Sequence, residues 1–378
     1  MLKEMKYRLN PTKKQARLLQ SQLEECRCLY NHFLEERKRG WDERQESLTY
    51  YGQKATLPAL KAYRPELSAV HSQVLQDVVM RVDLAFKAYF RRCKARDGKP
   101  GYPRFRGYGR YDSMTFPQYG NGCHLVDGVL KLSKVGALRV VQHRPLEGIP
   151  KTCTIRRSST GKWYVTIACE VDAHPLPSTG EAVGIDVGLL SFATLSTGES
   201  TSCPKFLRTE EKDLKRTQRQ LSAATNGTPE RRKRRKVVAR VHERITNRRT
   251  NFAHQESRRL VNRYDAIAVE DLSVNRMVHN HCLAKSIQDA AWSQFATFLS
   301  YKAAWAGRAF VAVNPAYTSQ DCSGCGHRQK KTLAERVHSC ACCGLILDRD
   351  HNAALNIKRL GLQSLGLSLE APGLSRGE

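Results

Sequence analysis

Five of the thirteen cysteines lie between Cys322 and Cys343, at a spacing typical of metal ligands. Four of them form two Cys-X-X-Cys-Gly motifs: Cys322 with Cys325, and Cys340 with Cys343. Each motif can point two thiolates at one ion, and the glycine after it allows the backbone to turn. We predict one tetrahedral four-thiolate zinc site, which is closed and therefore structural. Cys342 could replace a neighbour, but only Cys340 and Cys343 preserve the symmetry of the two motifs.

Three acidic residues end an apolar stretch or begin a predicted helix: Asp186 in GIDVG, Glu270 in AVEDL and Asp350 in LDRDHNAALNI. One such acid is more often a turn or cap residue. If three buried carboxylates converge, a cation is needed to compensate their negative charge. Carboxylate oxygens suit Mg²⁺ or Mn²⁺. Two ions held by shared carboxylates promote phosphodiester hydrolysis. Asp271 and Asp348 are alternative candidates for metal ligands, because strand alternation or the helix start decides which acid points into the site.

The charge of the chain indicates what it binds. Its 378 residues include 63 Lys and Arg against 36 Asp and Glu, a net charge of +27 that favours a long polyanion over a small-molecule substrate. Hydrophobic residues make up 40%, enough for folded cores. We find no apolar segment for a membrane or an export signal, so we expect a cytoplasmic, nucleoid-associated, prokaryotic protein with reduced cysteines.

Basic residues concentrate in a predicted helical region from about residue 208 to 264. It contains RRKRRK, starting at Arg231 and Arg232, and then Arg240, Arg244 and Arg248, which recur every four residues and share one helix face. Between 231 and 249 only Glu243 offsets these cations. We predict that this face contacts nucleic acid, with a solvated charged surface as the alternative.

The hydrophobic pattern changes along the chain. Helical spacing predicts helices around residues 19–33 and 72–94, and residues 99–120 are expected to be an exposed loop. Short strands are expected over 129–171. From Ala182 onward, strands alternate with helices and the acids follow in the order Asp, Glu, Asp, which is typical of an RNase H-like nuclease.

Several motifs give the chain a specific resemblance. GIDVG, VEDLSV, NPAYTSQDCSGCG and CGLILDRDHNAALNI resemble the successive nuclease and zinc-ribbon motifs of the TnpB (OrfB) proteins of insertion sequences, which are related to type V CRISPR effectors. In the first half, YRLNPTKKQ, AFKAYFRR and GYPRFRG resemble the same family. The resemblance covers about residues 1–361.

The resemblance implies an α+β multidomain fold. A wedge β-barrel domain would occupy residues 1–180 and contain an inserted helical recognition bundle at about 11–120. An RNase H-like (RuvC) α/β nuclease domain would occupy 181–361 and contain a zinc ribbon at about 318–347. Residues 362–378 would be a flexible tail.

The resemblance also implies RNA-guided DNA endonuclease activity. The partners would be a structured guide RNA and target double-stranded DNA, with Mg²⁺ or Mn²⁺, two ions in all, held by Asp186, Glu270 and Asp350 as catalytic residues. The alternatives are a nuclease-silent RNA-guided regulator and a strand-transfer transposase, although the latter usually has its acids in the order Asp, Asp, Glu. The tripeptide His279-Asn280-His281 spells HNH, but no ligand pattern around it supports a second nuclease site.

Further candidates for nucleic-acid contact lie in the first half. Amides and hydroxyls can address base edges, so Gln73, Gln76, Thr115 and Gln118 are candidate readers of a DNA motif flanking the target. Arg104 and Arg106 lie among aromatic residues, a composition that stacks on bases and holds phosphates. A solvated helix face or linker is the alternative for each of them.

Overall fold

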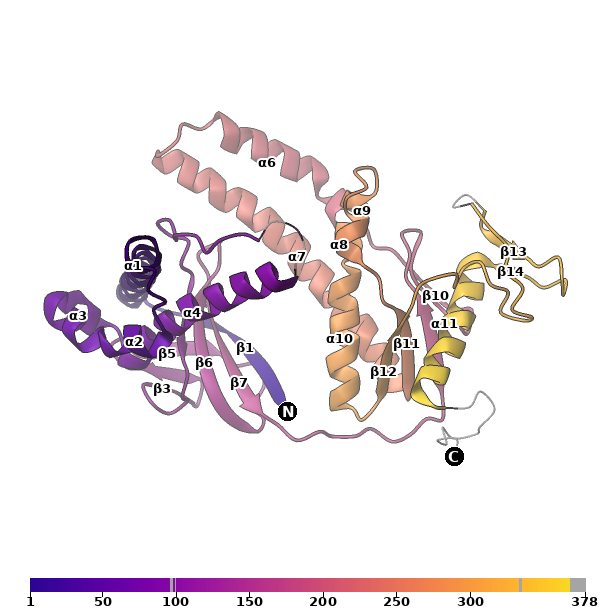
Figure 1. Ribbon diagram of the computed structural model, residues 1–378, viewed down its shortest axis with the longest axis horizontal. Helices are drawn as coiled ribbons and strands as arrows, with labels where there is room; N and C mark the ends of the chain where they lie inside the picture. Colours follow the sequence, from indigo (N-terminus) through magenta and orange to yellow (C-terminus); the bar gives the residue numbers. More distant parts are fainter. Residues whose placement is uncertain (96–97, 99, 333–334, 368–378) are drawn as a thin grey trace. The chain divides into compact units, whose positions relative to one another are not determined.

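The computed structural model describes residues 1–95, 98, 100–332 and 335–367. The chain divides into two compact units, Met1–Asp172 and Ala173–Glu378 (Figure 1). Most of the expected tail, residues 368–378, lies outside the described residues. Among the described helices, none combines the length and apolar character that crossing a membrane requires.

The first unit contains an antiparallel seven-stranded sheet in the order β2-β6-β7-β1-β5-β4-β3. Its strands are β1 (Leu2–Asn10), β2 (Ser113–Phe116), β3 (Cys123–Val126), β4 (Val129–Leu132), β5 (Gly136–Val141), β6 (Ile149–Arg157) and β7 (Trp163–Glu170). Alternate side chains of β1 are buried, namely Met5, Tyr7 and Leu9, because successive residues of a strand face opposite sides. β2 and β3 form the two ends of the order. The described strands thus follow one linear order, and the expected wedge β-barrel stays a prediction.

Helices fill the segment between β1 and β2: α1 (Lys13–Arg44), α2 (Tyr50–Ala55), α3 (Leu57–Tyr63), a 3₁₀ turn (Pro65–Ala69) and α4 (Ser72–Ala95). α1 begins in a capping box in which the Thr12 side chain accepts from the amide of Gln15 and the Gln15 side chain accepts from the amide of Thr12. Arg37 on α1 donates to Asp83 on α4 and to Gln53 on α2, so a buried polar group ties these helices together.

The second unit is built on a five-stranded sheet in the order β10-β9-β8-β11-β12. Its strands are β8 (Ala182–Asp186), β9 (Ser191–Leu195), β10 (Ser200–Ser202), β11 (Ala266–Glu270) and β12 (Ala309–Val313). β8, β11 and β12 are parallel, whereas β9 pairs antiparallel with both of its neighbours, β8 and β10. The carboxyl ends of β8 and β11 therefore meet at one edge of the sheet, where open α/β sheets commonly place their sites.

Around this sheet lie α5 (Phe206–Thr209), α6 (Glu211–Ala223), α7 (Pro229–Arg263), α8 (Val274–Met277), α9 (Ala284–Ala290), α10 (Trp292–Trp305) and α11 (Arg349–Leu365). A hairpin of β13 (Val337–Ser339) and β14 (Ile346–Asp348) leads into α11 (Figure 1). α11 continues four residues past the expected domain end at residue 361 and is closed by Gly366 in the left-handed conformation.

The two faces of this sheet bury side chains of different size. Val183, Ile185, Ile267 and Val269 pack in one core with residues of α7 and α10. The alternate positions of β8 and β11 carry small residues and pack against α11. A Cβ added at Gly184 would collide with the backbone of α11, so this helix approaches the sheet more closely than a larger residue would allow.

A buried carboxylate anchors the segment that enters the second unit. Asp265, just before β11, accepts hydrogen bonds from Ser178, Thr179 and Gly180 and pairs with the buried guanidinium of Arg308. Burial alone would raise the pKa of Asp265, but the hydrogen bonds outweigh burial and lower this pKa. The ionised carboxylate thus stabilises the start of the unit.

We expect Asp265→Asn to lower the free energy of unfolding by about 3 kcal/mol at pH 7, because Arg308 would keep a buried charge without its partner. Because the folded-state pKa is lowered, the contribution is present above the unfolded pKa of about 4 and disappears as pH falls through the folded value. Urea unfolding of both proteins at decreasing pH tests this, with the exposed Asp42→Asn as control. A difference that stays constant with pH would contradict it.

Candidate functional site

Two of the predicted acids lie side by side at the end of the sheet. In the parallel pairing of β8 with β11, Val269 is opposite Ile185, so Glu270 and Asp186 occupy the next position of the register. Side chains alternate between the two faces of a strand. Both acids fall at the alternate positions occupied by the small residues that face α11, and the positions between them face the core with α10. Both carboxylates are therefore placed toward α11.

The third acid comes from the start of α11. Asp350 lies in its first turn and is approached by the guanidinium of Arg349 at 3.2 Å. Its rival Asp348 is the N-cap, whose carboxylate accepts from the backbone amides of Asp350 and His351 at 2.9 and 3.1 Å. The capping role engages Asp348, which leaves Asp350 as the acid nearer to Asp186.

The three carboxylates influence one another electrostatically. Burial raises the pKa of Asp186 well above its ordinary value, and the negative charges of Glu270 and Asp350 raise it further, while Arg349 opposes them. Burial also raises the pKa of Glu270, against the hydrogen bond from Thr318. The rival Asp271 is exposed. Within the described part of the chain, the single charge of Arg349 opposes three carboxylates and cannot neutralise all of them.

Such a donor set fits a divalent cation. Hard carboxylate oxygens with a shortage of compensating charge are the environment that Mg²⁺ and Mn²⁺ occupy. The three carboxylates are not among the described groups whose possible ligand atoms all lie within 4.8 Å of one another. Carboxylates without a cation repel one another, so we expect a bound cation to shorten this spacing.

Thr318 holds Glu270 in place, and the sequence alone did not single it out. Its hydroxyl donates to Oε1 of Glu270 at 2.5 Å, and its backbone carbonyl accepts from the buried side chain of Asn356 at 2.9 Å. Asn356 lies on α11, so the helix that carries Asp350 also fixes the residue that orients Glu270. A threonine after the NPAY turn has no spacing that would distinguish it from an ordinary loop residue.

The four predicted zinc ligands come together as expected. The Sγ atoms of Cys322, Cys325, Cys340 and Cys343 all lie within 4.8 Å of one another. Cross-motif Sγ pairs are 3.5 and 3.6 Å apart, close to the roughly 3.8 Å expected around one tetrahedral zinc. The backbone amide of Cys343, helped by that of Cys342, lowers the pKa of the Cys340 thiol to about 6, which favours the thiolate that binds metal. The Cys342 side chain is outside the cluster.

Two buried asparagines tie the ribbon to α11. Asn352 donates to the carbonyl of Asp321 and accepts from the amide of Ser323, the residues on either side of Cys322. Asn356 donates to the same carbonyl of Asp321. Both asparagines are at most 1% exposed, so these bonds are shielded from water. The first zinc motif is thereby fixed to the helix of Asp350.

The predicted basic face of α7 is partly engaged within the protein. Arg244 and Arg248 both pair with Glu210 at 2.9 Å, and Glu210 comes from outside the segment in which we counted only Glu243. The expectation that this row is unneutralised is therefore corrected. Arg231 donates to the carbonyls that end α6, and Arg232 donates to the turn before α7. Arg240 is exposed.

In the first unit, three of the candidate base readers cluster. The side chain of Gln73 on α4 donates to that of Gln118 at 2.5 Å, and α4 packs on β2, which carries Thr115. The Thr115 hydroxyl accepts from Arg81 at 2.8 Å, so it is already engaged. Gln76 lies half-buried on α4.

The predicted loop before β2 runs along α1. Arg106 exchanges backbone hydrogen bonds with the side chain of Asn31, and its guanidinium lies 5.6 Å from the ring centroid of Tyr30. Arg104 is exposed. The expected loop of residues 99–120 is interrupted by β2, which pairs with β6 and buries alternate residues of SMTF in the core.

We expect the purified chain to contain about one zinc ion, measured by elemental mass spectrometry. Cys325→Ser removes one of four thiolates and should lower both the zinc content and the melting temperature, the latter by about 5 °C or more. Cys342→Ser, at the neighbouring exposed thiol, is the matched control and should retain zinc. Equal zinc content in the two variants would contradict the assignment.

Three family models match successive parts of the chain. The model described as "Helix-turn-helix domain" of IS605 OrfB matches residues 1–46, and "Probable transposase", the main IS605 OrfB model, matches residues 166–281. The model described as "Cas12f1-like, TNB domain" matches residues 292–357, which include the four-cysteine cluster. In the described structure the first of these segments contains β1 and the whole of one continuous helix, α1.

Relatives match over nearly the whole length. A Streptomyces pristinaespiralis protein named "Putative RNA-guided DNA endonuclease" is 38% identical over 94% of this chain and 89% of its own. The Escherichia coli K12 protein named "Putative RNA-guided DNA endonuclease InsQ" is 28% identical over 95% and 92%.

Solved structures show a similar fold. A Cas12f1 complex with sgRNA and target DNA has a TM-score of 0.57 at 14% identity over 92% of this chain and 83% of that one. The mini-RNA-guided endonuclease CRISPR-Cas_phi3 has a TM-score of 0.53 at 9% identity over 98% and 94%. The Streptomyces relative and the three family models together show that the chain belongs to the TnpB (OrfB) family of transposon-encoded proteins.

Proposed function

We propose that the protein is an RNA-guided DNA endonuclease that cleaves target DNA next to a short flanking motif. The observation that carries this is the placement of Asp186, Glu270 and Asp350 at one edge of the second sheet, on the side facing α11. Relatives that span most of the chain are named as RNA-guided DNA endonucleases. A regulator that only binds DNA would have no use for three half-buried carboxylates at one edge of the sheet.

The second unit then corresponds to the RuvC-like nuclease domain with its zinc ribbon, and the first to the wedge domain with inserted helices. Asp186, Glu270 and Asp350 would hold Mg²⁺ or Mn²⁺, in all two ions. Bound there, the ions would activate water and stabilise the leaving oxygen of the phosphodiester. Thr318 keeps Glu270 oriented, and Arg349 balances part of the negative charge beside Asp350.

The basic surfaces supply the grip on nucleic acid. We propose that exposed cations contact the guide RNA and its heteroduplex with DNA. Arg240 on α7 is the first candidate, because Arg244 and Arg248 are already paired. Arg104 and Arg106 on the loop along α1 are candidates of the same kind. Gln73, Gln76 and Gln118 are the candidate readers of the flanking DNA, because amide edges can address bases, whereas the Thr115 hydroxyl already accepts from Arg81.

We expect Asp186→Ala to retain guide RNA and bind target DNA but to cut it at least about 100-fold more slowly, since groups that merely support a metal ligand already contribute 10- to 100-fold. Cleavage and filter-binding assays on the complex with its guide RNA measure the two steps. Asp271→Ala, at the exposed neighbour of Glu270, is the matched control. Equal cleavage by Asp186→Ala and the unmodified protein would remove Asp186 from the reaction.

We expect Thr318→Val, which replaces the hydroxyl with a methyl group of similar size, to weaken apparent Mg²⁺ affinity by about 10-fold because Glu270 loses the donor that orients it. Titration of cleavage rate against Mg²⁺ concentration measures this. Thr318→Ser keeps the hydroxyl and should restore most of the affinity. If valine and serine behave alike, the hydrogen bond does not position Glu270.

A further inference from the structure

Compensation of negative charge around the three acids is uneven. Glu270 accepts a hydrogen bond from the Thr318 hydroxyl, which carries no charge. The Asp186 carboxylate accepts no hydrogen bond from the described part of the chain. Arg349 approaches Asp350 and also opposes the rise in the pKa of Asp186. The charge of this one arginine therefore acts on two of the three acids.

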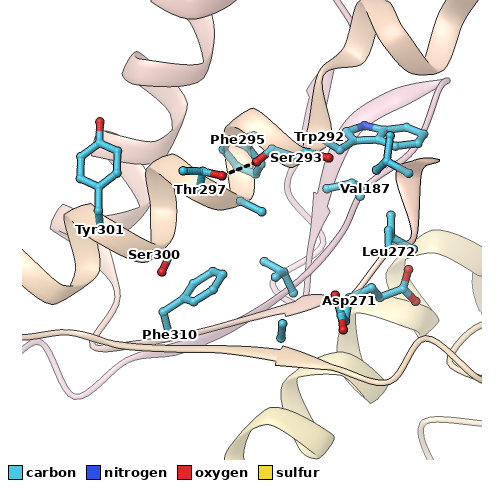
Figure 2. A pocket seen from close by; sticks show the side chains of 15 residues that line it. Val187, Asp271, Leu272, Trp292, Ser293, Phe295, Thr297, Ser300, Tyr301 and Phe310 are labelled. Carbon is cyan, nitrogen blue, oxygen red and sulfur yellow. Dashed lines mark hydrogen bonds between the residues drawn. The ribbon is translucent and has the colours of Figure 1, made fainter. Parts of the chain in front are cut away.

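The opposite face of the sheet supplies no cation to the acids. A cavity of about 430 Å³ lies there, between α10 and the carboxyl ends of β11 and β12, and Glu270 is one of its lining residues (Figure 2). As far as the structure describes it, the rest of the wall is apolar, aromatic or hydroxyl-bearing, and Asp271 adds a carboxylate rather than a base. The compensating charge comes from the side of α11, where Arg349 is the first residue of the helix.

The contact between Arg349 and Asp350 is loose. Nε and Nη2 of Arg349 lie 3.3 and 3.2 Å from the same carboxylate oxygen, Oδ1 of Asp350. A charge-assisted N–H···O bond is usually about 2.7–2.9 Å long, so these bonds are weak. The two donors nevertheless take up the two lone-pair directions of Oδ1. A cation that binds Asp350 through this oxygen would have to displace them.

A second anchor keeps the guanidinium nearby when it leaves Asp350. Nη1 of Arg349 donates to the backbone carbonyl of Glu335 at 3.1 Å, and only 14% of the side chain is exposed. A structural ion pair in this protein is built differently, because Asp265 accepts hydrogen bonds from three residues in addition to pairing with buried Arg308. Arg349 thus has the loose contact and the alternative partner of a displaceable counter-ion.

We propose that Arg349 is the internal counter-ion of the acid cluster. Its charge stabilises the three carboxylates while the site holds no divalent cation, and a cation that enters the site competes with it for Asp350. Arg349 therefore sets how much Mg²⁺ or Mn²⁺ the site requires. The proposal rests on the metal site of the proposed function and adds a regulation of that same site.

The sign of the effect separates this role from that of a positioning residue. Removing a residue that orients a metal ligand weakens metal binding, as we expect for Thr318→Val. Removing a competing positive charge strengthens metal binding, because a unit charge and a divalent ion repel each other. At about 6 Å and with the dielectric constant of water, this repulsion corresponds to a factor of roughly 10 in affinity.

We expect Arg349→Gln to bind Mn²⁺ about 10-fold more tightly than the unmodified protein. The probe is Mn²⁺ alone, added to the full zinc-loaded chain without RNA, and the free ion is measured by electron paramagnetic resonance. Arg349→Lys keeps the charge and should stay close to the unmodified affinity. Asp186→Ala identifies the part of the binding that belongs to the acid cluster. Arg336→Gln, at an exposed arginine just before β13, is the matched control and should change nothing.

Thermal unfolding gives a second readout. Without added Mn²⁺, Arg349→Gln should melt at a lower temperature than the unmodified protein, because the carboxylates lose their counter-ion. Added Mn²⁺ should then raise the melting temperature of this variant by more than that of the unmodified protein, because tighter binding stabilises the folded state more.

Equal or weaker Mn²⁺ binding by Arg349→Gln would overturn the proposal, as would an equal gain in Arg349→Lys. If Arg349→Gln loses its zinc or fails to unfold cooperatively, Arg349→Met keeps the aliphatic stem and carries the same expectation. Loss of folding in both variants would make Arg349 a structural residue and also overturn the proposal. The proposed function fails separately, through cleavage by Asp186→Ala. Tighter Mn²⁺ binding by Arg349→Gln in a protein that cuts no DNA would keep the counter-ion and remove the nuclease.

Discussion

The close packing of α11 on β8 and β11 is the constraint on which the candidate site depends. Gly184 on the sheet and Gly361 on the helix each lie where an added Cβ would collide with the opposite element. This short separation brings the first turn of α11, with Asp350, to the strand ends that carry Asp186 and Glu270. The packing buries Asp186 and brings the other acids toward it, and its pKa is raised first by burial and then by the negative charges of Glu270 and Asp350. A helix held further away would leave three unrelated surface acids.

The large positive charge of the chain is organised in two ways. Some cations stabilise the fold: Arg308 pairs with Asp265, and Arg244 with Glu210. Others, such as Arg240, extend into solvent and remain available to a polyanion. Sequence spacing identifies a helix face but cannot separate these two uses, because the compensating carboxylate comes from another element. The structure thus leaves fewer arginines of α7 available to contact nucleic acid than the full row that the sequence predicts.

The features that could be predicted best from the sequence are those that a short local pattern of residues determines. Two Cys-X-X-Cys-Gly motifs determined the thiolate cluster, and acids at the ends of apolar strands indicated the carboxylates, whose catalytic role remains a prediction. Contacts between distant segments were not predictable in the same way. Thr318 and the asparagines of α11 have no characteristic spacing, and their roles arise only when the 318–323 segment is laid on the helix. The order of strands in the first sheet likewise depends on pairing between distant segments, such as β1 with β7.

Hydrogen bonds connect the four-cysteine segment to the cluster of acidic residues next to it. Cys322 lies between two backbone groups bound by Asn352, and Cys343 precedes the strand that leads straight into Asp350. Asn356 carries the same connection to Thr318 and hence to Glu270. A zinc ion held by the four thiolates would therefore fix the segment on which the proposed Mg²⁺ ligands are mounted. Under the proposed function, loss of that zinc would loosen the placement of Asp350 and Glu270 without removing any carboxylate.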